Sequence, residues 1–76
     1  MLTFTDARRL VEAAIPGGGE TAAYGYESDR YWFPVVLPDR LGGRVPGVAK
    51  STGAVTWMSS ISEEYSNSRP YGALRP

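Results

Sequence analysis

Residues 31–37 read YWFPVVL, the most β-prone stretch of this 76-residue chain. Aromatic and β-branched residues favour strands, and successive side chains of a strand point to opposite faces. We predict that the core-facing set is Tyr31, Phe33, Val35 and Leu37, and that Trp32, Pro34 and Val36 form the other face. Pro34 has no N–H to donate, so it should lie at an edge, a bulge or a bend.

Strands are expected on both sides of this stretch. Residues 21–27, TAAYGYE, predict the preceding strand, and Ser28–Arg30 predict the tight turn between the two. Residues 38–46, PDRLGGRVP, are predicted to be a loop leading to a second hairpin. Its turn should be type I over Ser51 and Thr52, with Gly53 left-handed and Lys50 opposite Ala54.

The faces of the second hairpin follow from this register. Ala49, Val55 and Trp57 should share one face, which we expect to pack on a helix. The other, more polar face is predicted to hold Val48, Lys50, Thr56 and Met58.

That helix is predicted over residues 4–15. Apolar side chains recur at helical spacing, namely Phe4, Ala7, Val11, Ala14 and Ile15. Thr3 and Asp6 form a capping box, and Pro16 ends the helix. Arg8, Arg9 and Glu12 fall on the outer side, where we expect solvation.

The rest of the chain is less regular. Residues 60–63, SISE, predict one capped helical turn that runs to about Tyr65 or Ser66. The sequence therefore predicts the α+β class: an N-terminal helix packed on a small antiparallel sheet of about four strands, arranged as two hairpins. We assign residues 1–66 to a single domain and residues 67–76 to an extended or flexible tail.

The composition disfavours catalysis. The chain has no histidine and no cysteine, which excludes disulfides, thiolate metal sites and the commonest general base. Lys50 and Ser51 lie at a predicted turn, and the carboxylate pairs lie on predicted solvent-facing segments. We therefore assign neither a catalytic role. The glycine-rich stretches lack the phosphate-loop pattern. We expect no catalytic residue, no metal site and no cofactor.

The same chain shows no signal peptide and no membrane span, so a cytoplasmic protein is expected. Positive and negative residues balance at 8 each, and this balance disfavours nucleic acid as a partner.

Aromatic and arginine side chains between residues 24 and 44 predict a surface that binds another protein. Tyrosine, tryptophan and arginine dominate interface hot spots. The predicted partner-binding residues are Trp32, Arg44, Tyr24, Tyr26 and Arg40. The same aromatics near arginines also suit stacking on single-stranded nucleic acid, the weaker alternative here.

Several short motifs resemble the YrhB-type domain grouped with the immunity protein 35 family. They are Thr5 and Ala7 in the helix, Trp32 and Phe33 in the strand, Gly43 and Pro46 in the step that follows, and Val48, Lys50, Thr52, Gly53 and Val55 in the hairpin. The similarity covers about residues 3–65. Members usually have Asn after the glycine, where this chain has Arg44. The resemblance implies an α+β fold and the neutralisation of a toxin by binding.

The leading hypothesis is a small, non-catalytic, immunity-like or phage or mobile-element protein that binds and inhibits a protein partner, either a toxin or a host protein. A nucleic-acid-associated protein and a self-associating structural or regulatory subunit, including a homodimer, are the alternatives.

Overall fold

The chain begins with helix α1, Phe4–Ala14. The structure, a computed structural model, describes residues 2–37 and 43–72. The predicted capping box is present: Asp6 N–H donates to Thr3 Oγ1 at 3.1 Å and Thr3 N–H donates to Asp6 Oδ2 at 3.2 Å. These bonds satisfy two backbone donors at the helix start. The helix buries Phe4, Ala7 and Val11 and is too short to span a membrane, as is the other described helix.

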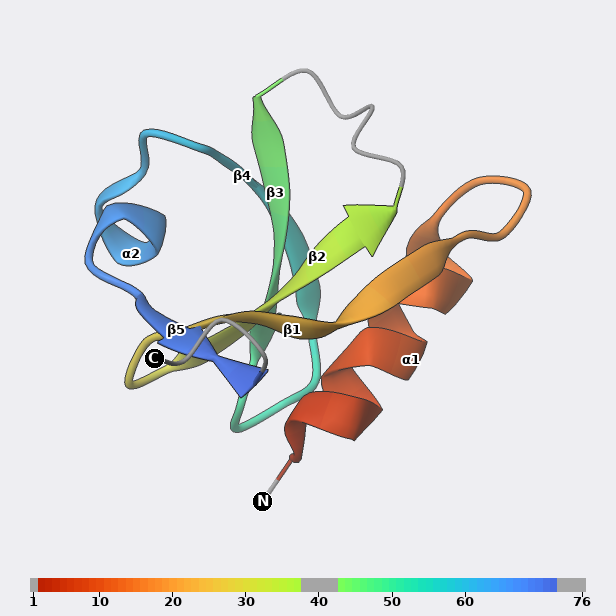
Figure 1. Ribbon diagram of the computed structural model, residues 1–76, viewed down its shortest axis with the longest axis horizontal. Coiled ribbons are helices and arrows are strands. Elements are labelled where there is room, and N and C mark those ends of the chain that lie inside the picture. The colour runs from red at the N-terminus through yellow and green to blue at the C-terminus, as the bar shows by residue number, and fades with distance from the viewer. Residues whose placement is uncertain (1, 38–42, 73–76) are drawn as a thin grey trace.

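The sheet has five antiparallel strands in the order β4-β3-β2-β1-β5. Their bounds are β1 Glu20–Glu27, β2 Tyr31–Leu37, β3 Arg44–Ala49, β4 Val55–Ser59 and β5 Arg69–Tyr71. A short helix α2, Glu63–Ser66, follows β4 and precedes β5 along the chain (Figure 1). The predicted fold class is confirmed, with five strands instead of about four. The single helical turn after residue 62 is also present, but its N-cap Ser62 makes no side-chain capping hydrogen bond.

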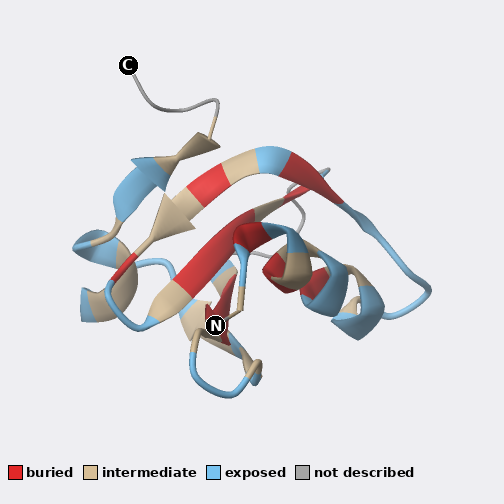
Figure 2. Ribbon diagram, turned by 90° about the horizontal axis from the view of Figure 1, so that it is seen from below, coloured by how far each residue is buried: buried red, intermediate tan, exposed pale blue. Residues whose placement is uncertain are grey.

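The predicted faces of β2 are reversed. Trp32 is only 8% exposed and belongs to the core cluster that α1 covers, together with Val36 and Val48. Phe33, only 1% exposed, lies on the opposite face, where Tyr65 of α2 packs edge-on at 5.2 Å between ring centroids. Because β2 is the central strand and is covered on both sides, three successive residues in its first half, Trp32 to Pro34, are buried in one unbroken run (Figure 2).

Strand β3 begins inside the predicted loop. It runs from Arg44, and its register places Ala49, not Lys50, opposite Ala54. Val48 pairs with Val55 and therefore joins Val55 and Trp57 on the helix side, contrary to the prediction. Trp57 packs against the helix-side core as predicted, and Gly53 has the predicted positive φ of 79°.

The predicted tail is only partly irregular. Arg69–Tyr71 form β5, which pairs with Glu27, Tyr26 and Gly25 of β1. The sheet therefore extends past the predicted boundary at residue 66. Tyr71 packs on Phe4 and Trp32, with centroid distances of 4.8 and 4.9 Å.

The outer side of α1 does more than face solvent. Arg8 donates to Thr21 Oγ1 at 3.0 Å and to Thr21 O at 2.8 Å, while Glu12 Oε2 accepts from Thr21 N–H at 3.0 Å and from its hydroxyl at 2.8 Å. Thr21 is 5% exposed. The predicted role of Arg8 and Glu12 in solvation is therefore wrong, because both side chains attach the helix to the start of β1.

Candidate functional site

Strands β2 and β3 are paired at one end only. Within residues 2–37 and 43–72, their register consists of Tyr31 with Ala49 and Trp32 with Val48. By contrast, β3 pairs with β4 from Arg44 to Val48. From the Trp32–Val48 pair onward β2 and β3 diverge (Figure 1). We call the opening between residues 34–36 and residues 44–46 the β2–β3 gap.

Two prolines explain where the pairing stops. Lys50 N–H donates to Arg30 O at 2.9 Å, which marks a hydrogen-bonded pair between β2 and β3. Such pairs alternate in an antiparallel ladder, so the next one is Trp32 with Val48. The one after that in register is Pro34 with Pro46. Neither residue has an N–H, so neither of the two hydrogen bonds expected there forms.

The gap leaves backbone groups without a strand partner. By the same alternation, the N–H and C=O of Val36 and of Arg44 point into the gap. No described strand pairs with them there. Val36 remains on the helix-side core and is 9% exposed, whereas Arg44 is exposed. An unpaired strand edge of this kind is a template for pairing with another chain.

A small apolar pocket lies in the gap. Its volume is about 70 Å³. For comparison, a cavity of about 150 Å³ admits benzene, so this pocket suits a small aliphatic side chain rather than an aromatic ring. The lining residues come from β1, β2, β3 and α2 and are Tyr26, Phe33, Pro34, Val35, Val36, Arg44, Val45, Pro46 and Tyr65.

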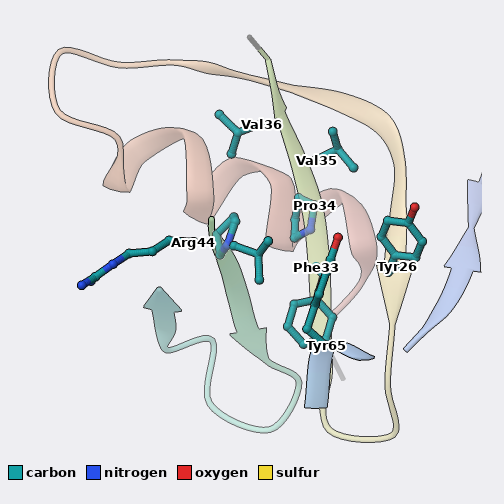
Figure 3. Close-up of a pocket in the computed structure, with 9 residues that line it drawn as sticks. Tyr26, Phe33, Pro34, Val35, Val36, Arg44 and Tyr65 are labelled. Atoms are coloured by element: carbon teal, nitrogen blue, oxygen red, sulfur yellow. The ribbon is translucent and has the colours of Figure 1, made fainter. Parts of the chain in front are cut away.

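Three aromatic rings close one end of this pocket. Tyr65 packs edge-on against Phe33 and also against Tyr26, at 5.6 Å between centroids. Such edge-on contacts add to the burial of the rings. Arg44 stands apart from the aromatic cluster, and its side chain extends away from it (Figure 3). Arg44 forms no ion pair with any carboxylate of the described residues, so its charge is open to a partner.

Helix α2 is held in place by the turn between β1 and β2. Arg30 donates to Glu64 Oε1 at 2.8 Å. A hydrogen bond from the Ser28 side chain, followed by the bond from Arg30, holds the pKa of Glu64 below its usual range. These contacts fix Tyr65 over Phe33, and the pocket is therefore preformed at its aromatic end.

The structure brings together two of the predicted partner-binding residues. Tyr26 and Arg44 line the same pocket. Tyr24 is half-buried within the irregular part of β1, between Thr21 and Gly25. Arg40 lies outside the described residues. Trp32 is buried on the opposite face, so the prediction that it faces outward is wrong.

Sequence reasoning missed other residues of the site. The pairing of Pro34 with Pro46 depends on a register that the sequence does not reveal. Tyr65 is predicted at the end of a helical turn, but the sequence predicts no contact for its ring. The signal that was available is the presence of one proline in each of two neighbouring strands, since proline is rare inside a sheet.

A second hollow lies between the two hairpin turns. It is open, has a volume of about 670 Å³, and is lined by Asp29, Arg30, Tyr31, Ala49, Lys50 and Ser51. Its charges have partners within the chain. Lys50 Nζ lies 2.9 Å from Glu27 Oε2 and 4.3 Å from the centre of the Trp32 ring. The ion pair with Glu27 explains the position of Lys50, so no catalytic pairing of Lys50 with Ser51 is needed. Because the charged groups of this hollow already have partners, it is a weaker candidate for a binding site than the gap.

Among the described residues, no group of three or more acidic, histidine or cysteine side chains gathers in a way that could hold a metal ion.

A scan of the chain against models of known protein families finds no match, and searches of curated proteins and of solved structures find none either. The resemblance to the YrhB-type domain and the immunity protein 35 family therefore stays a prediction from short sequence motifs.

Proposed function

We propose that this protein is a non-catalytic protein-binding module and that the β2–β3 gap is its recognition site. The observation that carries the proposal is the double-proline break. It places unpaired backbone groups beside an apolar pocket and an exposed arginine. Binding by strand addition uses these elements, since backbone hydrogen bonds supply affinity and side-chain pockets supply specificity.

The ligand is an extended segment of a protein partner. Its backbone pairs with Val36 or Arg44, and one small aliphatic side chain enters the pocket. A carboxylate on the segment meets the guanidinium of Arg44, because charge-assisted hydrogen bonds to arginine are stronger than neutral ones. Tyr26 and Tyr65 supply rigid aromatic surface at the closed end of the site.

The biological role that fits is inhibition by occupancy. A small protein without histidine or cysteine inactivates a toxin or a host protein by covering a segment that the target needs. Neutralisation of a toxin is what the resemblance to the immunity protein 35 family implies, and inhibition of a host protein is the corresponding role for a phage or mobile-element protein.

The experiment compares two variants with the same change of charge. Arg44→Glu alters the gap, and Arg9→Glu alters an exposed position on α1. Each tagged protein is incubated with native lysate, and the captured proteins are quantified by mass spectrometry. We expect one protein to be retained by the wild type and by Arg9→Glu and to be lost from Arg44→Glu, with a loss of about 1–3 kcal/mol when binding is then measured on the purified partner.

Equal capture by both variants would place the binding surface away from the gap. Retention of nucleic acid alone, or of no specific protein, would reject the protein-binding function itself.

A further inference from the structure

The two outer strands of the described sheet differ in their capacity to accept another strand. In β5 the central residue is Pro70, opposite Tyr26. Tyr26 makes its ladder bonds with Phe33 on β2, so the nitrogen of Pro70 points outward to the free edge. It carries no hydrogen, and this edge is therefore blocked. The part of β1 that β5 leaves uncovered contains the register shift between Thr21 and Gly25.

Strand β4 has no such protection. Its sequence is VTWMS, without proline and without charge. Proteins normally guard an edge strand with charges, prolines or bulges. The hydrogen bonds Ala49 N–H to Ala54 O at 3.0 Å and Ser60 N–H to Gly43 O at 2.6 Å set the alternation between β3 and β4.

That alternation determines which backbone groups of β4 are free. Thr56 and Met58 bond to β3, whereas Val55, Trp57 and Ser59 direct their N–H and C=O groups outward. The Ser59 carbonyl already accepts from Ser62 N–H at 2.9 Å. The edge thus offers three N–H donors, of Val55, Trp57 and Ser59, and two free carbonyl acceptors, of Val55 and Trp57.

This edge is complementary to itself. In an antiparallel pair of β4 strands related by a two-fold axis at Trp57, the two Trp57 residues exchange two hydrogen bonds. Ser59 N–H of each copy donates to Val55 O of the other, which adds two more. Closed two-fold dimers use the same patch on both copies in this way.

The side chains beside the edge support the same pairing. On the helix side, a hollow of about 270 Å³ next to Trp57 is lined by Ala14, Ile15, Pro16, Arg44 and Trp57. Leu10, which is 37% exposed, lies near the hairpin turn on the same side. The Trp57 ring of the second copy would meet this apolar hollow and the guanidinium of Arg44.

Charge favours a second copy as the occupant. Strand β4 carries no charged side chain, so it cannot select an oppositely charged partner. For the same reason, two β4 strands can pair without bringing like charges of these strands together. The whole chain is neutral, with 8 positive and 8 negative residues, so two copies do not repel each other at long range.

We propose that the protein forms a homodimer through β4, in which the two sheets join into one continuous sheet with Trp57 at the two-fold axis. The backbone pairing of β4 does not involve the β2–β3 gap, which lies on the other side of β3, although Arg44 lines both the gap pocket and the hollow beside Trp57.

The test has two parts. Sedimentation of the wild type over a range of concentrations should show a monomer–dimer equilibrium. Cysteine cross-linking then reports the register, because the chain has no cysteine of its own. Thr56 of one copy lies opposite Met58 of the other in a non-hydrogen-bonded pair, where the Cα atoms are about 4.5 Å apart, a separation that a disulfide spans.

A mixture of Thr56→Cys and Met58→Cys proteins should therefore form a covalent heterodimer under mild oxidation. The matched control mixes Ser51→Cys, an exposed turn position, with Met58→Cys. We expect at least a ten-fold excess of cross-linked dimer in the first mixture. A wild type that sediments as a monomer at every concentration overturns the proposal, and so does equal cross-linking in both mixtures. The sedimentation result stands even if a cysteine variant fails to fold.

Discussion

Trp32 connects four separate segments of the chain in the core. Its indole N–H donates to Leu2 O at 2.9 Å, and its ring packs edge-on against Phe4 and Tyr71. Lys50 lies over the same ring at 4.3 Å. The N-terminus, α1, the second hairpin and β5 thus meet at one side chain.

Trp32→Ala should therefore cost about 3–5 kcal/mol of unfolding free energy. Trp57→Ala should cost less, because Trp57 is half-buried on an outer strand. Urea unfolding of both variants measures the difference. A Trp32→Ala protein as stable as the wild type would mean that the core does not depend on this ring.

Ionisation of Glu12 should make the unfolding free energy depend on pH. Its pKa is held below its usual range first by the hydrogen bond from the Thr21 hydroxyl, then by the Thr21 N–H and by the charge of Arg8. A carboxyl group whose pKa is lower in the folded state than in the unfolded state stabilises the folded protein at pH values above the unfolded-state pKa. This stabilisation is lost as the pH falls through the folded-state pKa.

Unfolding free energy should consequently decrease as the pH falls below about 5. Glu12→Gln should show a shallower decrease, since the replaced side chain cannot ionise. Glu20→Gln, an exposed position at the start of β1, is the control and should keep more of the wild-type slope. Identical slopes for Glu12→Gln and the wild type would show that the bonds to Thr21 do not favour the ionised carboxylate.

At the scale of the elements, the turn between β3 and β4 depends on one glycine. Gly53 has a φ of 79°, and a Cβ added there would lie 3.4 Å from Leu10 Cδ1. Gly53→Val should destabilise the protein by about 1–3 kcal/mol, because a β-branched residue is strained in this conformation. Ser51→Ala in the same turn should have little effect. Thermal melts of both variants test this, and equal tolerance would contradict the turn geometry.

The gap between β2 and β3 depends on two prolines. A double variant, Pro34→Val with Pro46→Val, restores the missing N–H groups at the register position where both are absent. We expect the ladder to extend by one hydrogen-bonded pair, which hydrogen exchange would detect as slow exchange of the new amides at positions 34 and 46. Rapid exchange of both amides would show that something other than the prolines keeps the strands apart.

The elements differ in how well their sequences predict them. α1 was predictable because its apolar spacing, capping box and terminal proline all agree. The faces of β2 were not, because both are apolar and the period-two pattern cannot tell which one the helix covers. The first half of β3 has the sequence of a loop because Pro46 and Gly47 disfavour strands. Pro46 is tolerated because its nitrogen faces the gap, so no hydrogen bond to β4 is lost.

At the scale of the whole molecule, one sheet carries a helix on each face. α1 covers Trp32, Val36 and Val48, and the single turn of α2 places Tyr65 over Phe33. The fold class could be predicted from composition and periodicity. The candidate site could be predicted only in part: Tyr26 and Arg44 were expected at a binding surface, but the gap arises from a tertiary register between distant residues.

The measurement that tests the gap most directly is residue-resolved hydrogen exchange of the free protein by NMR. The amides of Val36 and Arg44 point into the gap, whereas those of Trp32 and Val45 lie within ladders. We predict that Val36 and Arg44 exchange faster than Trp32 and Val45 by a factor on the order of a hundred. Exchange of Val36 and Arg44 as slow as that of Trp32 and Val45 would mean that the sheet is closed at this point, and the proposed recognition site would not exist.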